Sequence, residues 1–296
     1  FAPVQILECI RAAVNAEDFD AGMAVEQKCF AACLSHPQRE ALIHIFFAER
    51  AANKIPDLPK DVPLLEVTRG SIIGAGTMGG GIAMCFANAG IPVRIHDNDP
   101  ENLARGMKVI EGNYARTVSK GRLSQGEMDN RLSLIIPTEN FDDLGDGDVI
   151  IEAVYENLEL KKEIFSRLDG IVKEGTILAT NTSGLDVDAI AAVTSRPDQV
   201  CGLHFFSPAN VMPLLEVVRG KESSPVVLGT AMALGKRLGK VSVMAGNCPG
   251  FIGNRMIGGY SRQATMMILE GASPAQIDKV IYDFGLAMGP FAMADM

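Results

Sequence analysis

The sequence contains no tryptophan and only four histidines, and its 36 acidic residues outnumber its 27 basic ones. The formal net charge of -9 argues against a nucleic-acid partner, because proteins that bind a phosphate backbone usually present a basic face. Long apolar runs are also missing, since none approaches the ~18 residues that a membrane-spanning helix requires. We therefore predict no nucleic-acid partner and no membrane span.

Cysteine motifs are absent as well. The six cysteines form no CxxC pair and no cysteine–histidine cluster with the spacing of a zinc site. We expect free, buried thiols, which suit a reducing compartment, and no bound metal. The cysteines are Cys9, Cys29, Cys33, Cys85, Cys201 and Cys248.

The length of 296 residues, 47% of them apolar, allows about two globular domains with connecting structure. Residues 1–65 are predicted to be a helical linker, because two runs of helical periodicity, separated by Pro37, precede the proline-rich stretch KIPDLPKDVP. Residues 66–247 alternate short β-rich runs with helical patterns, and residues 248–296 contain helical patterns only. The predicted fold class is α/β, with a doubly wound, mostly parallel sheet and a partial C-terminal all-α domain.

The alternation within residues 66–247 is regular enough to place individual elements. We expect strands at 67–73, 93–96, 149–153, 177–180, 200–204, 214–218 and 241–244. Helices are expected at 78–88, 100–119, 158–172 and 224–238. Two amphipathic helices should follow at 248–271 and 273–285, the second with a serine cap and a proline in its first turn.

A glycine-rich turn follows the first expected strand. Gly74, Gly76 and Gly79 form a GxGxxG motif, with Thr77 and Met78 inside it. The first glycine permits the tight turn, the second lets the backbone approach a pyrophosphate, and the third lets the helix pack on the strand. The helix N-terminus then faces the phosphates with its positive end. This order predicts a Rossmann-type site formed by all five residues.

An acidic residue completes this site. Asp97 ends the next apolar run, about 20 residues after the glycine turn, where a carboxylate can accept from the ribose hydroxyls of an adenosine. A carboxylate there repels the 2′-phosphate of NADP. Arg94 lies within the strand rather than after it, so no basic residue takes the place of the acid. We therefore predict NAD rather than NADP as the cofactor.

One histidine is placed for chemistry. His204 lies at the carboxyl end of an expected strand, the edge where open α/β sheets bind ligands. Glu216 lies on the next strand, after a loop bounded by Pro208 and Pro213 that allows a return beside His204. A histidine oriented by a carboxylate can remove a hydroxyl proton while a hydride leaves the carbon. The alternative is that His204 is a structural hydrogen-bonding residue.

Two further polar groups are expected near the same edge. Ser183 follows the strand that ends at Thr180, in the run TNTSG, and Asn254 lies in GFIGNR, at the start of the helical region. Their structural alternatives are a helix cap for Ser183 and a helix-surface amide for Asn254.

Six motifs, in this order along the chain, resemble those of the L-3-hydroxyacyl-CoA dehydrogenases of fatty-acid β-oxidation. They are GAGTMGGGIA, EAVYENLELKK, TNTSGL, HFFSPANVMPLLEV, NCPGFIGNR and MGPF, and they extend from about residue 67 to residue 296. The resemblance implies that His204 is the general base and Glu216 its partner. It also implies that Ser183 and Asn254 hold substrate and cofactor in line.

The same resemblance implies further residues and the reaction. Glu156 and Lys161 would line the nicotinamide side of the cofactor site, and Asn181 would lie near it. The reaction implied is the oxidation of an L-3-hydroxyacyl-CoA to a 3-ketoacyl-CoA with NAD.

The front segment resembles a particular part of this family. The run FFAERAANKIP is similar to the linker between the enoyl-CoA hydratase and dehydrogenase parts of multifunctional β-oxidation enzymes. This implies a chain truncated at both ends, with a hydratase part of the same protein before it and further helices of the acyl-CoA cleft after it. A thiolase subunit is a candidate partner. We expect a cytoplasmic protein, with the peroxisome and the mitochondrion as alternatives.

Two other classes fit parts of the pattern. The β-hydroxyacid dehydrogenases share the glycine turn but use a lysine of the helical domain, where this chain has Asn254 and Arg255 and no lysine before Lys279. A non-catalytic NAD-binding relative would not need the set of His204, Glu216, Ser183 and Asn254. Both classes are therefore disfavoured.

Overall fold

The computed structural model describes residues 1–52, 54–55, 57–59 and 61–295 of the chain. These form two compact units, Phe1–Ile55 and Pro56–Met296. The predicted boundary region includes positions 56 and 60, which lie outside the described residues.

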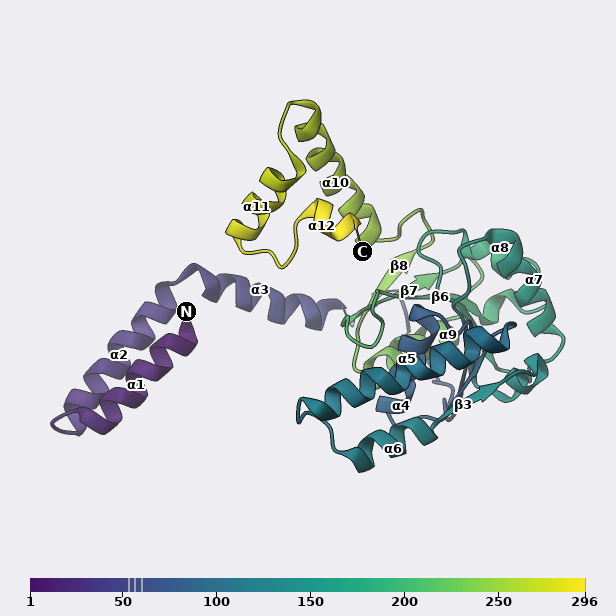
Figure 1. The fold of residues 1–296 in the computed structure, drawn as a ribbon, viewed down its shortest axis with the longest axis horizontal. Helices are drawn as coiled ribbons and strands as arrows, with labels where there is room; N and C mark the ends of the chain where they lie inside the picture. Colours follow the sequence, from purple (N-terminus) through teal and green to yellow (C-terminus); the bar gives the residue numbers. More distant parts are fainter. Residues whose placement is uncertain (53, 56, 60, 296) are drawn as a thin grey trace. The chain divides into compact units, whose positions relative to one another are not determined.

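The first unit is helical, as predicted. It contains α1 (Ala2–Asn15), α2 (Phe19–Ser35) and α3 (Pro37–Ala52), at the purple end of the colour scale in Figure 1. Asp18 caps α2 by accepting from the Ala21 N–H, and Pro37 is the first residue of α3, where its missing N–H costs no hydrogen bond. The helices α1 and α2 pack against each other.

The second unit is built on a sheet which, within the described residues, has the strand order β3-β2-β1-β4-β5-β6-β7-β8. Neighbouring strands are parallel except for β6 and β7, which are antiparallel. The predicted doubly wound, mostly parallel sheet is therefore confirmed. The strands are β1 (Gly70–Ile73), β2 (Val93–His96), β3 (Ile135–Thr138), β4 (Val149–Glu152), β5 (Ile177–Thr180), β6 (Val200–Phe205), β7 (Leu214–Arg219) and β8 (Val241–Gly246).

Helices cover this sheet and create its buried core. On one face, α7 and α8 pack over a cluster that includes Ile150, Phe165 and Leu178, while α4 and α5 lie on the other side (Figure 1). The helix α9 packs against β6, β7 and β8. The bounds are α4 (Thr77–Asn88), α5 (Pro100–Ser119), α6 (Gln125–Ser133), α7 (Leu158–Asp169), α8 (Val187–Ala191) and α9 (Pro225–Arg237).

The sequence prediction missed the edge strand β3 and the helix α6. The strand is the short run IIPT, whose Pro137 cannot donate to a ladder and is tolerated because β3 is an edge strand. The helix begins with a capping box, in which Ser124 and Glu127 each accept a hydrogen bond from the other's backbone N–H. That signal was present in the sequence.

The segment before β1 belongs to the second unit. Asp57 is ion-paired with Arg219, and the Leu65 N–H donates to Thr230 Oγ1 at 2.9 Å. The predicted linker extends to residue 65, whereas the structure divides the chain after Ile55. The difference arises because these contacts tie the segment to the sheet.

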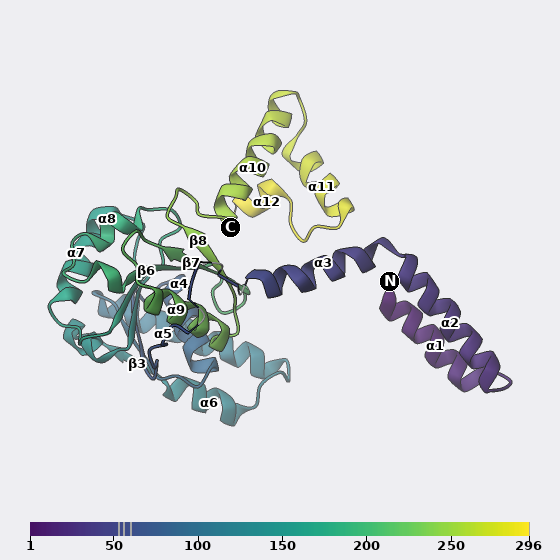
Figure 2. The same cartoon turned by 180° about the vertical axis from the view of Figure 1, so that it is seen from behind.

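The C-terminal helices form a small cluster, shown in yellow-green in Figure 2. They are α10 (Gly253–Leu269), α11 (Pro274–Phe284) and α12 (Pro290–Ala294). Helix α10 begins five residues later than the expected residue 248, because Gly250 (φ 73°) and Phe251 (φ 45°) turn the chain first. Helix α11 begins as predicted, with a capping box formed by Ser273 and Gln276.

The cysteines are free thiols, half-buried at Cys9, Cys33 and Cys248 and buried at the other three positions. In the described part of the chain, no group of histidine, cysteine, aspartate and glutamate side chains is arranged to hold a metal ion. Nor does any described helix combine the length and apolar character needed to cross a membrane.

Candidate active site

The glycine turn has the geometry that the motif predicts. Gly74 has φ of 100°, in the left-handed region that favours glycine. A Cβ on Gly79 would lie 1.8 Å from the carbonyl oxygen of Gly74, so only glycine allows α4 to start this close to β1. A Cβ on Gly76 would meet nothing within 4 Å. Gly76 therefore faces open space in front of the α4 N-terminus, which suits a pyrophosphate.

Replacement of Gly76 by valine should remove cofactor binding without unfolding the protein. The residue has β-region dihedral angles, φ -71° and ψ -168°, which valine adopts readily. The side chain would fill the space that the pyrophosphate needs, so we expect the Kd for NADH to rise by at least about tenfold. Fluorescence titration measures the Kd, and thermal unfolding checks the fold. Gly112→Val, at an equally open position of α5, should leave both unchanged.

Asp97 lies directly beside the glycine turn. Its Oδ2 accepts from the Ala75 N–H at 2.9 Å, and its Oδ1 accepts from the Asp99 N–H at 3.1 Å. These bonds fix the carboxylate at the end of β2 and facing the turn. The side chain is half-buried, so it is accessible to a ribose.

Removal of the Asp97 charge should weaken discrimination against NADP. Asp97→Asn keeps an acceptor for the Ala75 N–H, whereas Asp97→Ala removes both the charge and the acceptor. We expect both variants to lower the ratio of kcat/KM for NAD to that for NADP by about tenfold or more. Asp99→Asn is the neighbouring control. If both Asp97 variants discriminate as strongly as the wild type, Asp97 does not select the cofactor.

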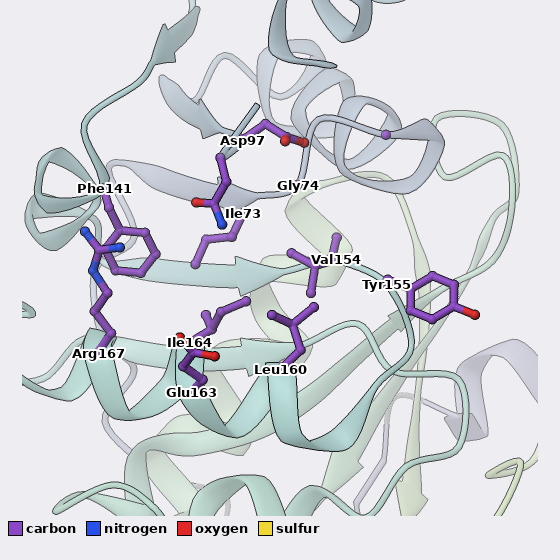
Figure 3. A pocket seen from close by; sticks show the side chains of 13 residues that line it. Ile73, Gly74, Asp97, Phe141, Val154, Tyr155, Leu160, Glu163, Ile164 and Arg167 are labelled. Atoms are coloured by element: carbon purple, nitrogen blue, oxygen red, sulfur yellow. The ribbon is translucent and has the colours of Figure 1, made fainter. Parts of the chain in front are cut away.

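A cavity of about 390 Å³ opens between the ends of β1, β2 and β4 (Figure 3). Asp97 lies at one side of it, and at one end the Arg167 guanidinium lies 3.8 Å from the ring centroid of Phe141. This is the point where the strand order reverses, which is where dinucleotides bind in such sheets. The cavity is lined by Ile73, Gly74, Gly76, Asp97, Asn98, Phe141, Ala153, Val154, Tyr155, Leu160, Glu163, Ile164 and Arg167.

A second cavity, of about 360 Å³, lies on the α5 side of the glycine turn. Gly76 and Asp97 line both cavities, so the two adjoin at the turn. The second cavity is bounded by α4, by α5 with Asn102 and Arg105, and by the loop between β6 and β7, which contributes Pro208 and Asn210.

His204 and Glu216 form a buried pair. They are directly opposite each other in the antiparallel register of β6 and β7, and His204 Nδ1 lies 2.7 Å from Glu216 Oε2. His204 is 5% exposed and Glu216 is fully buried. The His204 ring packs against the rings of Phe206 and Phe251, at centroid distances of 4.5 and 5.7 Å. The hairpin-like return expected from the sequence is therefore observed.

The other oxygen of Glu216 holds the start of α10. Oε1 accepts from the backbone N–H groups of Ile252 at 3.1 Å and Gly253 at 2.7 Å. Burial alone would raise the pKa of Glu216, but the hydrogen bonds from His204 and from the Gly253 N–H outweigh it and lower the pKa. Glu216 is therefore a carboxylate at neutral pH, and it joins the sheet to the first C-terminal helix.

Glu156 accepts hydrogen bonds from several polar groups of the TNTSG run. Its Oε1 accepts from the Thr182 hydroxyl at 2.6 Å, from the Ser183 N–H at 2.7 Å and from the Ser183 hydroxyl at 3.0 Å. Burial opposes ionisation, yet these bonds and the Lys161 charge lower the pKa of Glu156. Asn254 Nδ2 donates to the Ser183 carbonyl at 3.4 Å. The structure thus brings Glu156, Ser183 and Asn254 together, and it is Asp186, not Ser183, that caps α8.

Lys161 lies behind Glu156 rather than on the surface of the site. Its side chain is 1% exposed, and Nζ lies 2.7 Å from Glu152 and 3.4 Å from Glu156. Glu152 also accepts from the Thr180 hydroxyl at 2.7 Å. Lys161 therefore contacts two carboxylates and has almost no exposed surface of its own, whereas the Glu156 side chain is 39% exposed. Asn181 joins the ends of β5 and β6 by accepting from the Phe205 N–H at 2.8 Å.

Several residues of this region were not predicted from the sequence. Glu152 could have been found, because it ends a strand and a carboxylate in such a position needs a partner. The stacking of Arg167 on Phe141 carries no local signal, because helix α7 and the 3₁₀ helix Phe141–Asp146 meet only in the folded chain.

The glycine turn, the acid at the end of β2 and the histidine–carboxylate pair at the carboxyl end of β6 together define an NAD-dependent oxidoreductase. Comparison with known proteins specifies the family. Residues 70–248 match the family model "3-hydroxyacyl-CoA dehydrogenase, NAD binding domain", and residues 250–296 match its C-terminal domain. The chain belongs to the 3-hydroxyacyl-CoA dehydrogenase family.

Individual relatives agree with this assignment. The peroxisomal bifunctional enzyme of Danio rerio is 44% identical over 300 residues, covering 100% of this chain and 41% of the relative. The human peroxisomal bifunctional enzyme is 40% identical, covering 97% and 40%. The solved (S)-3-hydroxybutyryl-CoA dehydrogenase from Ralstonia eutropha is 37% identical, with a TM-score of 0.75 over 78% of this chain and 82% of that one. The chain thus spans about two fifths of the length of the bifunctional relatives.

Proposed function

We propose that the protein carrying this chain oxidises L-3-hydroxyacyl-CoA to 3-ketoacyl-CoA with NAD, as a step of fatty-acid β-oxidation. The observation that carries this proposal is the buried His204–Glu216 pair, 2.7 Å apart at the edge of the sheet where ligands bind. The oxidation of an alcohol needs, at this position, a general base with a pKa near neutral pH.

The ionised state of Glu216 decides the tautomer of His204. A carboxylate can only accept, so His204 Nδ1 must carry the proton that forms the 2.7 Å bond. His204 Nε2 then has a free lone pair and takes the proton of the 3-hydroxyl. The bound NAD supplies the acceptor for the hydride that leaves C3. Glu216 stabilises the imidazolium that results.

The remaining polar residues fit roles in alignment. The Asn254 amide, in the first turn of α10, contacts the backbone carbonyl of Ser183, which follows β5. From these positions the two side chains can hold the substrate and the nicotinamide in line. Glu156 fixes Ser183, and the buried Lys161 fixes Glu156. The second cavity, with the cationic Arg105 on its α5 wall, suits the phosphate-bearing part of coenzyme A.

We also infer the context of the chain in a longer protein. The helices α1 to α3 resemble a linker in sequence, and relatives of more than twice this length are named bifunctional, which supports a hydratase part in the same protein. A thiolase partner stays a prediction. The relatives from animals and plants are named peroxisomal, with identities of 38–44%, and bacterial fatty acid oxidation subunits reach 35–36%. This favours the peroxisome over the cytoplasm expected from the sequence.

An assay with both substrate enantiomers tests the proposal. The full-length protein with NAD should oxidise L-3-hydroxybutyryl-CoA and leave the D-enantiomer unchanged. Oxidation of free 3-hydroxybutyrate at a comparable rate would point to a hydroxyacid dehydrogenase instead. Binding of NADH without turnover of any of these compounds would point to a non-catalytic relative.

A further inference from the structure

The loop between β6 and β7 is held in place by one lysine. Lys240 Nζ donates to the backbone carbonyls of Ala209 at 2.5 Å and Met212 at 2.9 Å. Ala209 is fully buried, and its carbonyl also accepts from the Cys85 thiol at 3.3 Å. Within the loop, the N–H groups of Val211 and Met212 both donate to the Pro208 carbonyl. The carbonyls of Ala209 and Met212 therefore depend on Lys240 for a charged donor.

On its other side, the loop rests against the cofactor-binding helix α4. A Cβ on Gly81 would lie 3.0 Å from Ala209 Cβ and 3.2 Å from the Ala209 nitrogen. The glycine thus lets the loop approach α4 closely. Since Lys240 immediately precedes β8 (Val241–Gly246), the loop is fixed between α4 and the last strand of the sheet.

The loop connects directly to the His204–Glu216 pair. Phe206, at its start, packs on the His204 ring, and a Cβ on Gly253 would come within 2.8 Å of the Phe206 ring. Pro208 and Asn210 of the loop form one wall of the second cavity. A displacement of the loop would therefore change both the packing of His204 and the shape of this cavity. It would not change the contacts of Gly74, Gly79 and Asp97.

We propose that Lys240 is a positioning residue, which holds the β6–β7 loop so that acyl-CoA and the His204 ring are correctly placed. The proposal rests on the function proposed above. Lysine suits this task because its ammonium has three donors and can serve two carbonyls at once. Its loss leaves both carbonyls without a charged donor, at a cost typical of hydrogen bonds to charged groups.

The test compares Lys240→Met with Lys240→Arg in the full-length protein. In Lys240→Met we expect KM for acetoacetyl-CoA to rise by about tenfold or more and kcat to fall, with an unchanged Kd for NADH. Lys240→Arg, which keeps a charged donor, should restore most of the loss. The control is Lys173→Met, because Lys173 Nζ also donates to a backbone carbonyl, that of Asp146, and pairs with Asp148, but it does so at the amino ends of β4 and β5, opposite the edge that carries the pair. This control should leave KM unchanged.

Hydrogen exchange of residues 206–213 in the cofactor-free protein gives a readout that does not depend on turnover. Lys240→Met should exchange faster in this segment and not in 93–96 or 149–152. Unchanged exchange and unchanged KM would overturn the proposal, as would a parallel loss of NADH affinity. The wild-type protein could lack dehydrogenase activity while Lys240→Met still speeds hydrogen exchange in residues 206–213. In that case the proposed function is wrong, and the proposal that Lys240 holds the β6–β7 loop is retained. If Lys240→Met does not fold, Lys240→Gln provides the same comparison with a neutral donor.

Discussion

His204→Ala should abolish the reduction of acetoacetyl-CoA by NADH while leaving NADH binding nearly unchanged. We expect kcat to fall by a factor of about 10²–10⁴, because a positioned general acid–base group contributes roughly that much. The same ring donates the proton to the keto oxygen in reduction and accepts it in oxidation. His204 does not contribute to the glycine turn or to the Asp97 contacts, so the Kd for NADH should stay nearly the same.

The substitution also removes a buried ring, so its effect on folding needs a control. His204→Gln fills more of the space against Phe206 and Phe251 and should be equally inactive. His44→Ala, in the exposed part of α3, should leave turnover intact. Steady-state kinetics and NADH titration on the same preparations make the comparison. Retention of most of the turnover by both His204 variants would rule out the assignment of the base.

Glu216→Gln should lower kcat by about 10²–10⁴, a range consistent with the loss seen when the carboxylate that orients a catalytic histidine becomes an amide. The reason lies in the two oxygens of Glu216. The amide has one carbonyl oxygen, and the N–H groups of Ile252 and Gly253 require it. Its NH₂ group then faces His204 Nδ1 and forces the proton onto Nε2, which is the wrong tautomer for a base.

Asp278→Asn is the matched control for this variant. Asp278 also accepts from two backbone N–H groups at the start of a helix, those of Phe291 at 3.0 Å and Ala292 at 2.9 Å, but no histidine is involved. It should affect stability and not kcat. Nitrogen-15 NMR of the histidines distinguishes the two tautomers directly. An active Glu216→Gln protein whose His204 still carries the proton on Nδ1 would contradict the argument.

Glu216 also makes the attachment of α10 depend on pH. Its pKa is lowered in the folded protein, so its contribution to stability is complete above the pKa of the unfolded chain. That contribution is lost as the pH falls through the lowered folded pKa. Glu216→Gln should therefore lose less stability between neutral and acidic pH than the wild type does, as urea unfolding at several pH values can show.

Local patterns in the sequence were sufficient for most of the fold. Three features are determined by residues that are close together in the sequence and could therefore be predicted from it. They are the glycine motif, the alternation of strands and helices, and the loop between Pro208 and Pro213. The edge strand β3 was missed because it is short and contains Pro137. The start of α10 was misplaced because the expected helix included Pro249 and Gly250, a dipeptide typical of turns, and because a positive φ at Phe251 is uncommon for a residue other than glycine.

The candidate site was predictable only in part. The His204–Glu216 contact followed from chain reversal, since residues that oppose each other in an antiparallel pair share a face. Three other features depend on elements that are far apart in the sequence. They are the contact of Glu216 with both His204 and the start of α10, the burial of Lys161, and the hydrogen bonds of Lys240 to the β6–β7 loop. Lys240 is 31 residues from Ala209, and nothing in the local sequence links the two.

The most direct test of the central claim follows the hydrogen that leaves the substrate. L-3-hydroxybutyryl-CoA deuterated at C3 is mixed with NAD and the full-length protein in a single turnover, and the NADH formed is analysed by mass spectrometry. We expect deuterium in the NADH, acetoacetyl-CoA as the product, and no transfer with His204→Ala. Undeuterated NADH, or equally fast transfer without His204, would contradict the account.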